Sequence, residues 1–453
     1  MSEETWDSIV IGAGPSGLFT AALLASRGQR VVVLEAGPRI GGRRGSGAID
    51  GAPVEDGAFA LSRTGGWEDV YAEIGKPVPT GRNFGQAEYF RDGEWRPLLD
   101  PQDRGELRKV LAEIEAMSYT DAASFDDVPL DQWLRERTDN QRIADLFFVQ
   151  TTGALVANTP DQISAGEGIN LLKQTLDRNG SLGKFFIVVD GSSPTLYGPL
   201  QDAITEAGGE VRLNTPVQDV TVEDGRAIGV EIETGRRIAA SHVRDTVRLL
   251  ADDVICTVPP WNLFNVIAAS HFPAEYVTGV TELSTKVSHV AGVTYGVSEP
   301  AWDVELMRWY LPAMPKLGVV LGAYFEGPSV LQFYTQLHWY EHPYLLDQRS
   351  AENRRRTRAF LRDFEDEVLE LFPEVVPTVR WRMPNIAPFC VAQAPGLVGD
   401  VRPSWITPVP HLYLVSNQVR EARGIGHDAA AHVAIACANH LAPRAATVGV
   451  GTR

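Results

Sequence analysis

Three glycines near the start of the chain have the spacing of a phosphate-binding loop. Gly12, Gly14 and Gly17 lie in the segment IGAGPSG, and Glu35 follows eighteen residues after Gly17. In such a loop the first glycine permits a tight turn, the second lets a diphosphate approach the backbone, and the third lets a helix pack closely on a strand. A carboxylate placed like that of Glu35 accepts hydrogen bonds from ribose hydroxyls, which argues against a 2′-phosphate. The pattern predicts a bound dinucleotide.

A strand, a helix and a second strand are needed to hold these residues in place. The run DSIVI is short and apolar, as in a buried parallel strand, and a segment rich in alanine and leucine then favours a helix that ends near Gly28. The run RVVVLEA predicts a second strand that ends at Glu35. The helix start offers unpaired N–H groups and a partial positive charge, so we expect Pro15 and Ser16 beside the phosphates. The alternative interpretation is a glycine-rich turn without a ligand.

Two arginines follow in a second glycine-rich segment, AGPRIGGRRGSG. Arg43 and Arg44 come directly after Gly42. Glycine allows close backbone contact, and guanidinium groups can offset the charge of a diphosphate. We therefore expect these three residues to contact the cofactor; the alternative is a solvated loop.

The region from Glu35 onward resembles the FAD fingerprint of the phytoene desaturase and amine oxidase flavoprotein superfamily. Glu35, Gly41-Gly42-Arg43 and the stretch DGAPVEDGAFAL carry the resemblance. It implies that the Gly-Gly-Arg segment crosses the pyrophosphate. It also implies that a later segment passes beside the flavin ring, with contacts from Gly57, Ala58 and Phe59.

Two further segments extend the resemblance. In residues 194–260 we expect a helix and then strands that turn at Asp224-Gly225 and at Thr234-Gly235. Here the resemblance implies that the backbone of Val217 meets the adenine, and Ala36 is a further expected cofactor contact. The third segment has a strand at residues 412–415 and then a glycine-rich start of an alanine-rich helix.

The resemblance implies that the start of this last helix points at the flavin ring, where its dipole favours the reduced, anionic ring. The superfamily commonly has Gly-Asp where this chain has Ser416-Asn417, but Asn417 can still form a hydrogen bond with the ribityl chain. The cofactor contacts expected here are Asn417, Ile425, Gly426 and His427.

These segments predict an α/β fold with two domains. Residues 1–75, 194–260 and 408–453 are expected to form a discontinuous, Rossmann-like FAD-binding domain. Residues 76–193 and 261–407 are expected to form an α+β substrate-binding domain built on a mixed sheet, which covers the flavin. Part of its dense aromatic content would line a substrate pocket, while most of it fills the core.

Candidate catalytic side chains are few. His427 lies at the predicted flavin-facing helix start, where the positive helix end would lower its pKa, and His338 and Tyr340 share one face of a predicted strand. Amine oxidases often carry a lysine that holds water at the flavin, but Lys286 is too far along the chain from Trp302 for us to transfer that role. The alternative for His427 is a helix-capping or solvent-facing histidine.

Charge and composition exclude other classes of function. The net charge of −17 would repel nucleic acid and anionic membranes. We find no apolar run long enough to cross a bilayer and no basic signal segment at the start, so we expect a soluble, cytoplasmic protein. Three widely separated cysteines predict reduced thiols, and we expect no metal site.

The predicted function is that of an FAD-dependent oxidoreductase of the dehydrogenase or desaturase type. It would remove hydride from a C–H bond of a small apolar or aromatic molecule and pass electrons to oxygen or a quinone. Three alternatives stay open: an FAD-containing isomerase or cyclase without net oxidation, a flavin amine oxidase, and an escort protein without turnover.

Overall fold

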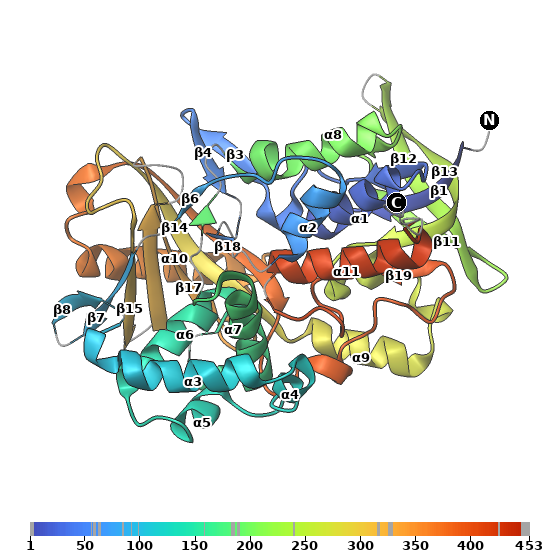
Figure 1. Cartoon of the computed structure of the whole chain (residues 1–453). Coiled ribbons are helices and arrows are strands. Elements are labelled where there is room, and N and C mark those ends of the chain that lie inside the picture. Colours follow the sequence, from blue (N-terminus) through green and yellow to red (C-terminus); the bar gives the residue numbers. More distant parts are fainter. Residues whose placement is uncertain are drawn as a thin grey trace, which may run out of the picture.

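Two large β-sheets, each covered by helices, make up the architecture of this computed structural model (Figure 1). The structure describes residues 4–444 except for residues 56, 58–59, 62–64, 84–85, 92, 98, 158, 183–185, 188–190, 239–240, 315–317, 325–328 and 425. The helices α1, α2, α8 and α11 gather around the first sheet, and β14, β15, β17 and α10 lie at the opposite end of the molecule (Figure 1).

The first sheet has the strand order β10-β2-β1-β13-β12-β11, and β19 also pairs with β13. Its members are β1 (Glu4–Ile11), β2 (Val31–Leu34), β10 (Glu210–Arg212), β11 (Val217–Glu223), β12 (Arg226–Ile238), β13 (Ser241–Cys256) and β19 (Leu412–Leu414). Neighbours in the group β10, β2, β1, β13 and β19 run parallel, and the apolar residues of β1, β2 and β19 are buried because helices pack on the sheet. These helices are α1 (Pro15–Ser26), α2 (Gly66–Glu73), α8 (Gly198–Glu206) and α11 (Gly426–Leu441).

The predicted strand–helix–strand start is confirmed, with the helix ending just before Gly28, whose φ is 89°. The turn predicted at Asp224-Gly225 is also confirmed, because it joins β11 to β12. The turn predicted at Thr234-Gly235 is wrong. Both residues lie inside β12, which continues to pair with β13 as far as Ile238. Pairing with a long neighbouring strand overrides the local turn signal of the glycine.

The second sheet has the order β18-β14-β17-β16-β15-β7-β8. It is mixed, since β15 and β7 are parallel and the other neighbours are antiparallel. Its strands are β7 (Gln86–Arg91), β8 (Glu94–Pro97), β14 (Val287–Val297), β15 (Leu306–Met314), β16 (Gly318–Tyr324), β17 (Val330–Leu337) and β18 (Val379–Val391). One face packs on α10 (Ala351–Leu371) through a core that includes Phe333, Phe360 and Phe364. Part of the other face packs on a second core, in which Trp309 and Ala323 meet residues of α6 and α7.

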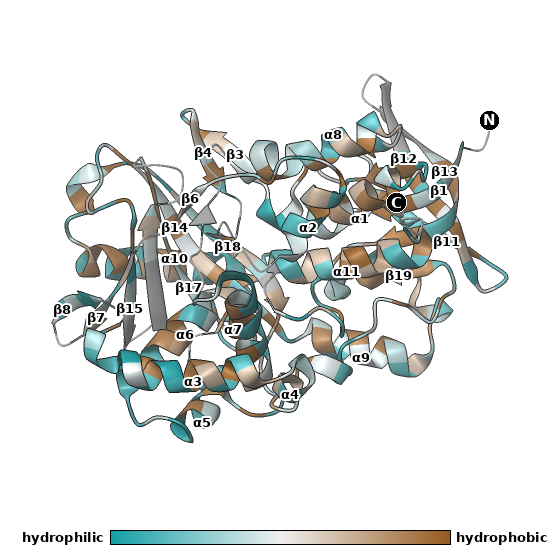
Figure 2. Cartoon of the chain, in the orientation of Figure 1, coloured by the Kyte–Doolittle hydropathy of each residue, from teal (hydrophilic) through white to brown (hydrophobic). Residues whose placement is uncertain are grey.

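The remaining helices pack beside the second sheet and below the first. They are α3 (Arg104–Ala116), α4 (Tyr119–Ala123), α5 (Leu130–Arg135), α6 (Gln141–Leu155), α7 (Ala165–Asn179) and α9 (Ala274–Ser284). In α3, Leu107, Val110 and Ile114 are buried, and Figure 2 shows hydrophobic and hydrophilic residues alternating along this helix. The smaller strands are β3 (Ser46–Ile49) and β4 (Ala52–Glu55), which form a hairpin, and β5 (Ala60–Leu61), β6 (Arg82–Asn83) and β9 (Phe186–Ile187).

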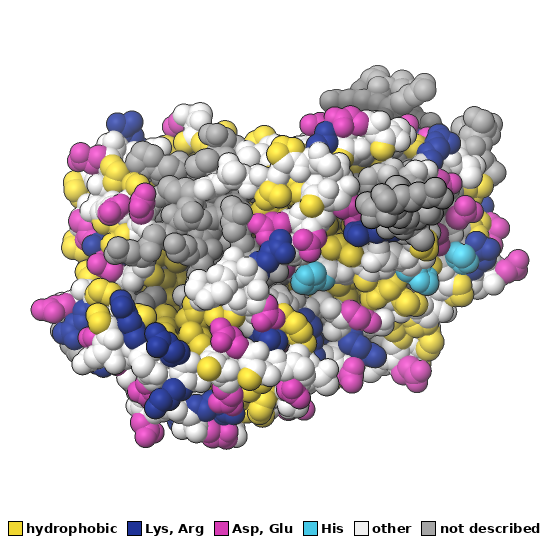
Figure 3. All heavy atoms as spheres, in the orientation of Figure 1, with side chains coloured by type: hydrophobic (Ala, Val, Ile, Leu, Met, Phe, Trp, Pro, Cys, Tyr) yellow, Lys and Arg dark blue, Asp and Glu magenta, His cyan; other side chains and the backbone are white. Residues whose placement is uncertain are grey.

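The surface carries charges of both signs. On the face drawn in Figure 3, Lys and Arg side chains are interspersed with Asp and Glu. Within the described part of the chain, every helix is too short or too polar to cross a lipid bilayer.

Candidate cofactor and substrate sites

A cavity of about 370 Å³ lies where several parallel strands of the first sheet end. It is lined by residues from all three segments that the sequence singled out, near the starts of α1 and α11 and directly after β13 and β19. The lining residues are Gly12, Gly14, Pro15, Ser16, Glu35, Gly42, Arg43, Arg44, Thr257, Val258, Pro259, Asn262, Ser416, Asn417, Gly426 and Ala430. The carboxyl ends of parallel strands are the usual place for a ligand in such sheets.

The three glycines of the first loop differ in what surrounds them. Gly12 has a φ of 104°, a left-handed conformation that favours glycine. A Cβ on Gly17 would lie 2.0 Å from the carbonyl oxygen of Gly12, so only glycine lets α1 pack this closely, as the sequence predicted. A Cβ on Gly14 would meet nothing within 4 Å, because this residue borders the open cavity. No side chain caps α1 at Gly14, so the first N–H groups of the helix can bind an anion.

Glu35 fixes the loops on both sides of itself. One carboxylate oxygen accepts a hydrogen bond from the Ala13 N–H at 2.8 Å, and the other accepts from the Gly37 N–H at 2.7 Å. Each oxygen keeps a second lone pair, so the carboxylate can still accept a hydrogen bond from a ribose hydroxyl in the cavity. Ala36 and Val217 do not line the cavity, and their predicted contacts with the cofactor stay predictions.

Arg43 and Arg44 follow Gly42 in a single 3₁₀ turn that begins beside the first loop. A Cβ on Gly42 would lie 3.2 Å from the Cα of Gly14, which shows how closely the two glycine-rich segments approach. Desolvation by the surrounding protein lowers the pKa of both guanidinium groups, although Arg43 is exposed toward the cavity and Arg44 is half-buried. A diphosphate would stabilise these charges. The donors, the open glycine and the helix start together fit the diphosphate of FAD.

The loop before α11 is held by a partly buried ion network, in which Glu167 is the fully buried member. Arg423 forms ion pairs with Asp126 at 2.7 Å and with Glu167 at 2.6 Å. Glu167 also accepts a hydrogen bond from the Gly424 N–H at 3.2 Å. The network therefore fixes the start of α11, where Gly426 lines the cavity.

His427, the second residue of α11, is buried and does not line the cavity. Its Nε2 lies 2.8 Å from the hydroxyl of Tyr197, and the two rings stack at 5.7 Å. The pKa of His427 is lowered, in the direction expected from the sequence, but the larger cause is burial, with the charge of Arg44 second. His427 is therefore placed to position α11 rather than to touch a substrate.

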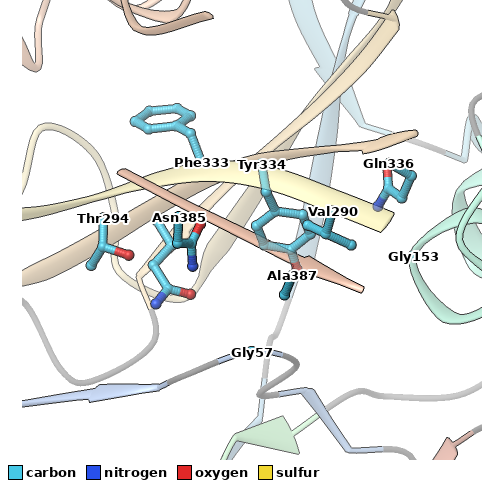
Figure 4. A pocket seen from close by; sticks show the side chains of 10 residues that line it. Gly57, Gly153, Val290, Thr294, Phe333, Tyr334, Gln336, Asn385 and Ala387 are labelled. Carbon is cyan, nitrogen blue, oxygen red and sulfur yellow. The ribbon is translucent and has the colours of Figure 1, made fainter. Parts of the chain in front are cut away.

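A second cavity, of about 50 Å³, lies against the face of the second sheet opposite α10 (Figure 4). Its lining residues are Gly57, Gly153, Val290, Thr294, Gln332, Phe333, Tyr334, Gln336, Asn385 and Ala387. In Figure 4 the side chains of Val290, Tyr334 and Ala387 extend from the sheet toward Gly57, while Phe333 projects to the other side. Among the described residues of this lining, none has a charged side chain.

Strand pairing arranges these residues in rows across β18, β14 and β17. Ala387, Val290 and Gln336 form one row, and Asn385, Gly292 and Tyr334 form the next. A Cβ on Gly292 would lie 2.8 Å from the Cβ of Tyr334 and 3.1 Å from the Oδ1 of Asn385. Any larger residue at this position would clash, so glycine lets Tyr334 and Asn385 approach each other closely across β14. We call this surface the polar grid, defined by Thr294, Gln332, Tyr334, Gln336 and Asn385 around Gly292.

The structure does not bring the other catalytic candidates to this cavity. β17 ends at Leu337, so the predicted alternation does not extend to His338 and Tyr340. Tyr340 is 59% exposed and its hydroxyl accepts a hydrogen bond from Gln162, while His338 is buried outside the lining. Lys286, to which no role was transferred, lies over the ring of Trp339 and is not among the described lining residues.

Three of the predicted cofactor contacts, Ala58, Phe59 and Ile425, lie outside the described residues. Gly57 is described, and it lines the second cavity rather than the first. Sequence reasoning did not name Thr257, Val258, Pro259, Asn262, Ser416 and Ala430 as cofactor contacts, although all six line the first cavity. Two of these directly follow β13, and the place where a parallel strand ends is the signal that could have found them.

Comparison with known proteins gives one family and several distant relatives. Residues 15–440 match the family described as flavin containing amine oxidoreductase. Putrescine oxidase of Kocuria rosea is 27% identical over 282 residues, which are 58% of this chain and 58% of that protein. The 15-cis-phytoene desaturase of Glycine max is 26% identical over 248 residues, which are 48% of this chain and 42% of that protein. The alignments thus span about half the length of these relatives.

Among solved structures, an oxidoreductase from Methanosarcina mazei superposes with a TM-score of 0.68 at 17% identity. The superposition covers 95% of this chain and 99% of the other. At this identity the likeness concerns the fold.

Proposed function

This chain belongs to the family of flavin-containing amine oxidoreductases, and we propose that it removes hydride from a C–H bond of a small, uncharged substrate. Its cofactor is FAD, and its general class is that of FAD-dependent oxidoreductases of the amine oxidase and desaturase type. Bound FAD supplies a ring that accepts hydride. The proposal assigns the first cavity to the diphosphate and the second to the substrate.

In this proposal the first sheet and its helices form the FAD-binding domain, and the second sheet forms the substrate-binding domain. Gly14, Arg43 and Arg44 hold the diphosphate, Glu35 holds the ribose, and Asn417 binds the ribityl chain. The ring then lies near Gly57, because this residue lines the cavity beneath the polar grid. Support comes from the shared lining of the first cavity by three distant segments.

One observation carries the choice of an uncharged substrate: the described lining of the second cavity contains no Asp, Glu, Lys or Arg. Burial raises the pKa of Tyr334, so its phenol stays neutral, and the charge that acts on it is that of Arg44. A protonated amine entering this cavity would lose its water without gaining a counter-ion from the described lining. The site therefore favours dehydrogenation of an uncharged molecule over oxidation of a diamine.

The side chains of the cavity have two tasks. Val290, Ala387 and the ring of Tyr334 supply apolar surface that excludes water and suits the apolar or aromatic substrate expected from the sequence. The amides and hydroxyls of the polar grid can orient that substrate so that one C–H bond faces the flavin. Oxygen or a quinone then takes up the electrons, as proposed from the sequence.

The test is anaerobic mixing of the purified holoprotein with paired probes, each pair being an uncharged cyclic molecule and the amine of the same skeleton. We expect bleaching of the visible flavin absorption by uncharged members and none by amines. Bleaching by amines alone would overturn the proposal in favour of an amine oxidase. A product of unchanged mass with the flavin colour retained would support an isomerase, and failure to take up FAD would support an escort protein.

A further inference from the structure

Gln336 is a buried carboxamide that has no side-chain partner among the described residues. The residue is 1% exposed, and neither its Oε1 nor its Nε2 forms a hydrogen bond within the described part of the chain. Gln336 nevertheless lines the second cavity, on the same face of β17 as Tyr334. Buried amides in folded proteins almost always have partners, because an unsatisfied one loses its hydration without compensation. A group that enters the cavity is therefore needed to satisfy it.

The position of Gln336 limits what that group can be. Across the sheet its neighbours in the same row are Val290 and Ala387, which offer no hydrogen bonds. A carboxamide presents one acceptor and one donor side by side in a plane. A carboxylate would satisfy only the donor and would bury a charge in an uncharged cavity. A ketone would also satisfy only the donor.

We propose that Gln336 recognises a carboxamide or lactam group on the substrate through two reciprocal hydrogen bonds. The Nε2 donates to the carbonyl oxygen of that group, and the Oε1 accepts from its N–H. The rest of the substrate extends from Gln336 toward Tyr334 and Asn385, which line the same cavity. This inference rests on the proposed function, because it places the substrate in the same cavity, and it makes Gln336 a specificity-determining residue.

The experiment uses benzamide and acetophenone as probes of the FAD-loaded protein. The two molecules have nearly the same shape, but only benzamide carries the N–H groups that Oε1 can accept. Perturbation of the visible flavin spectrum on titration gives the dissociation constant of each probe. We expect benzamide to bind at least about tenfold more tightly than acetophenone, the effect of one additional hydrogen bond in a buried site.

Two variants and a control separate recognition from structure. Gln336→Leu keeps the approximate volume and removes both polar atoms, so the preference for benzamide should vanish while the melting temperature stays equal or rises. Gln336→Glu keeps the shape and removes the donor, so benzamide should bind more weakly than to the original protein. Thr335→Ser changes a buried neighbour that alternates to the other face of β17, and both affinities should stay unchanged.

Equal binding of the two probes to the original protein, or an unchanged preference in Gln336→Leu, would overturn the inference. A large fall in the melting temperature of Gln336→Leu would do the same, because it would show that Gln336 has a structural partner. These results are distinct from failure of the proposed function. That failure would appear in the anaerobic mixing experiment, as a flavin that the uncharged cyclic molecules do not reduce. It would not depend on whether benzamide or acetophenone binds more tightly.

Discussion

Replacement of Gly14 by alanine separates cofactor binding from folding. The backbone of Gly14 has φ −77° and ψ −179°, which alanine adopts without strain, and an added Cβ meets no atom within 4 Å. The cost to the stability of the protein without FAD should stay below about 1 kcal/mol, the scale of a changed residue at a helix N-cap. The new methyl group, however, projects where a diphosphate must approach the start of α1.

The expected loss of affinity follows from the hydrogen bonds that the methyl group displaces. One N–H bond to a charged phosphate contributes about 1.5–3 kcal/mol. Its loss corresponds to a roughly 10- to 150-fold increase in the dissociation constant of FAD. The assay is titration of FAD into the protein freed of cofactor, followed by quenching of the flavin fluorescence, with thermal unfolding of the same samples.

Gly105→Ala is the matched control. Gly105 also has open space around its Cα, but it lies on the exposed side of α3, far from the cavity residues. We expect unchanged FAD affinity and a small gain in stability, since alanine is the better helix former. Unchanged FAD affinity in Gly14→Ala, with folding intact, would refute the assignment of this loop to the diphosphate.

Three further changes test other parts of the structure. Gly17→Ala should lower the free energy of unfolding by about 1–3 kcal/mol, because the added Cβ would overlap the carbonyl oxygen of Gly12. Chemical denaturation measures this loss, and an unchanged denaturation midpoint would contradict the prediction. Arg423→Met should lower the free energy of unfolding by about 3–5 kcal/mol, since it leaves the carboxylate of Glu167 buried without its ion pair. A free energy of unfolding that stays unchanged within error would count against the ion network. Burial lowers the pKa of His338 from 6.5 to about 4, so the unfolded chain binds a proton that the folded protein does not, and stability should fall as pH falls through this interval. His338→Asn should reduce that slope in melting temperature against pH, and an identical slope would contradict the assignment.

The cofactor loop could be predicted because its signals are local. An apolar run, a glycine at position 12 and a carboxylate after the next apolar run all lie in one stretch of sequence. In the structure the first run is largely buried in β1, Gly12 has a positive φ, and the second run forms the buried strand β2. Each residue acts within a single strand–helix–strand unit, so spacing along the chain determines spacing in the structure.

The substrate cavity could not be predicted in the same way. Thr294, Gln336 and Asn385 lie on three strands that come together only through long-range pairing, and the sequence does not reveal the register of that pairing. The aromatic content of the segment after Val330 predicts a strand, but not its end at Leu337. For this reason His338 and Tyr340 were expected on the cavity face and were found elsewhere.

Determination of the FAD-bound structure tests the central claim most directly. The account predicts the diphosphate between the start of α1 and the guanidinium groups of Arg43 and Arg44. It also predicts the flavin ring beside Gly57, with the polar grid facing it across the second cavity. FAD bound with its ring remote from Gly57, or with its diphosphate away from Gly14, would contradict the account.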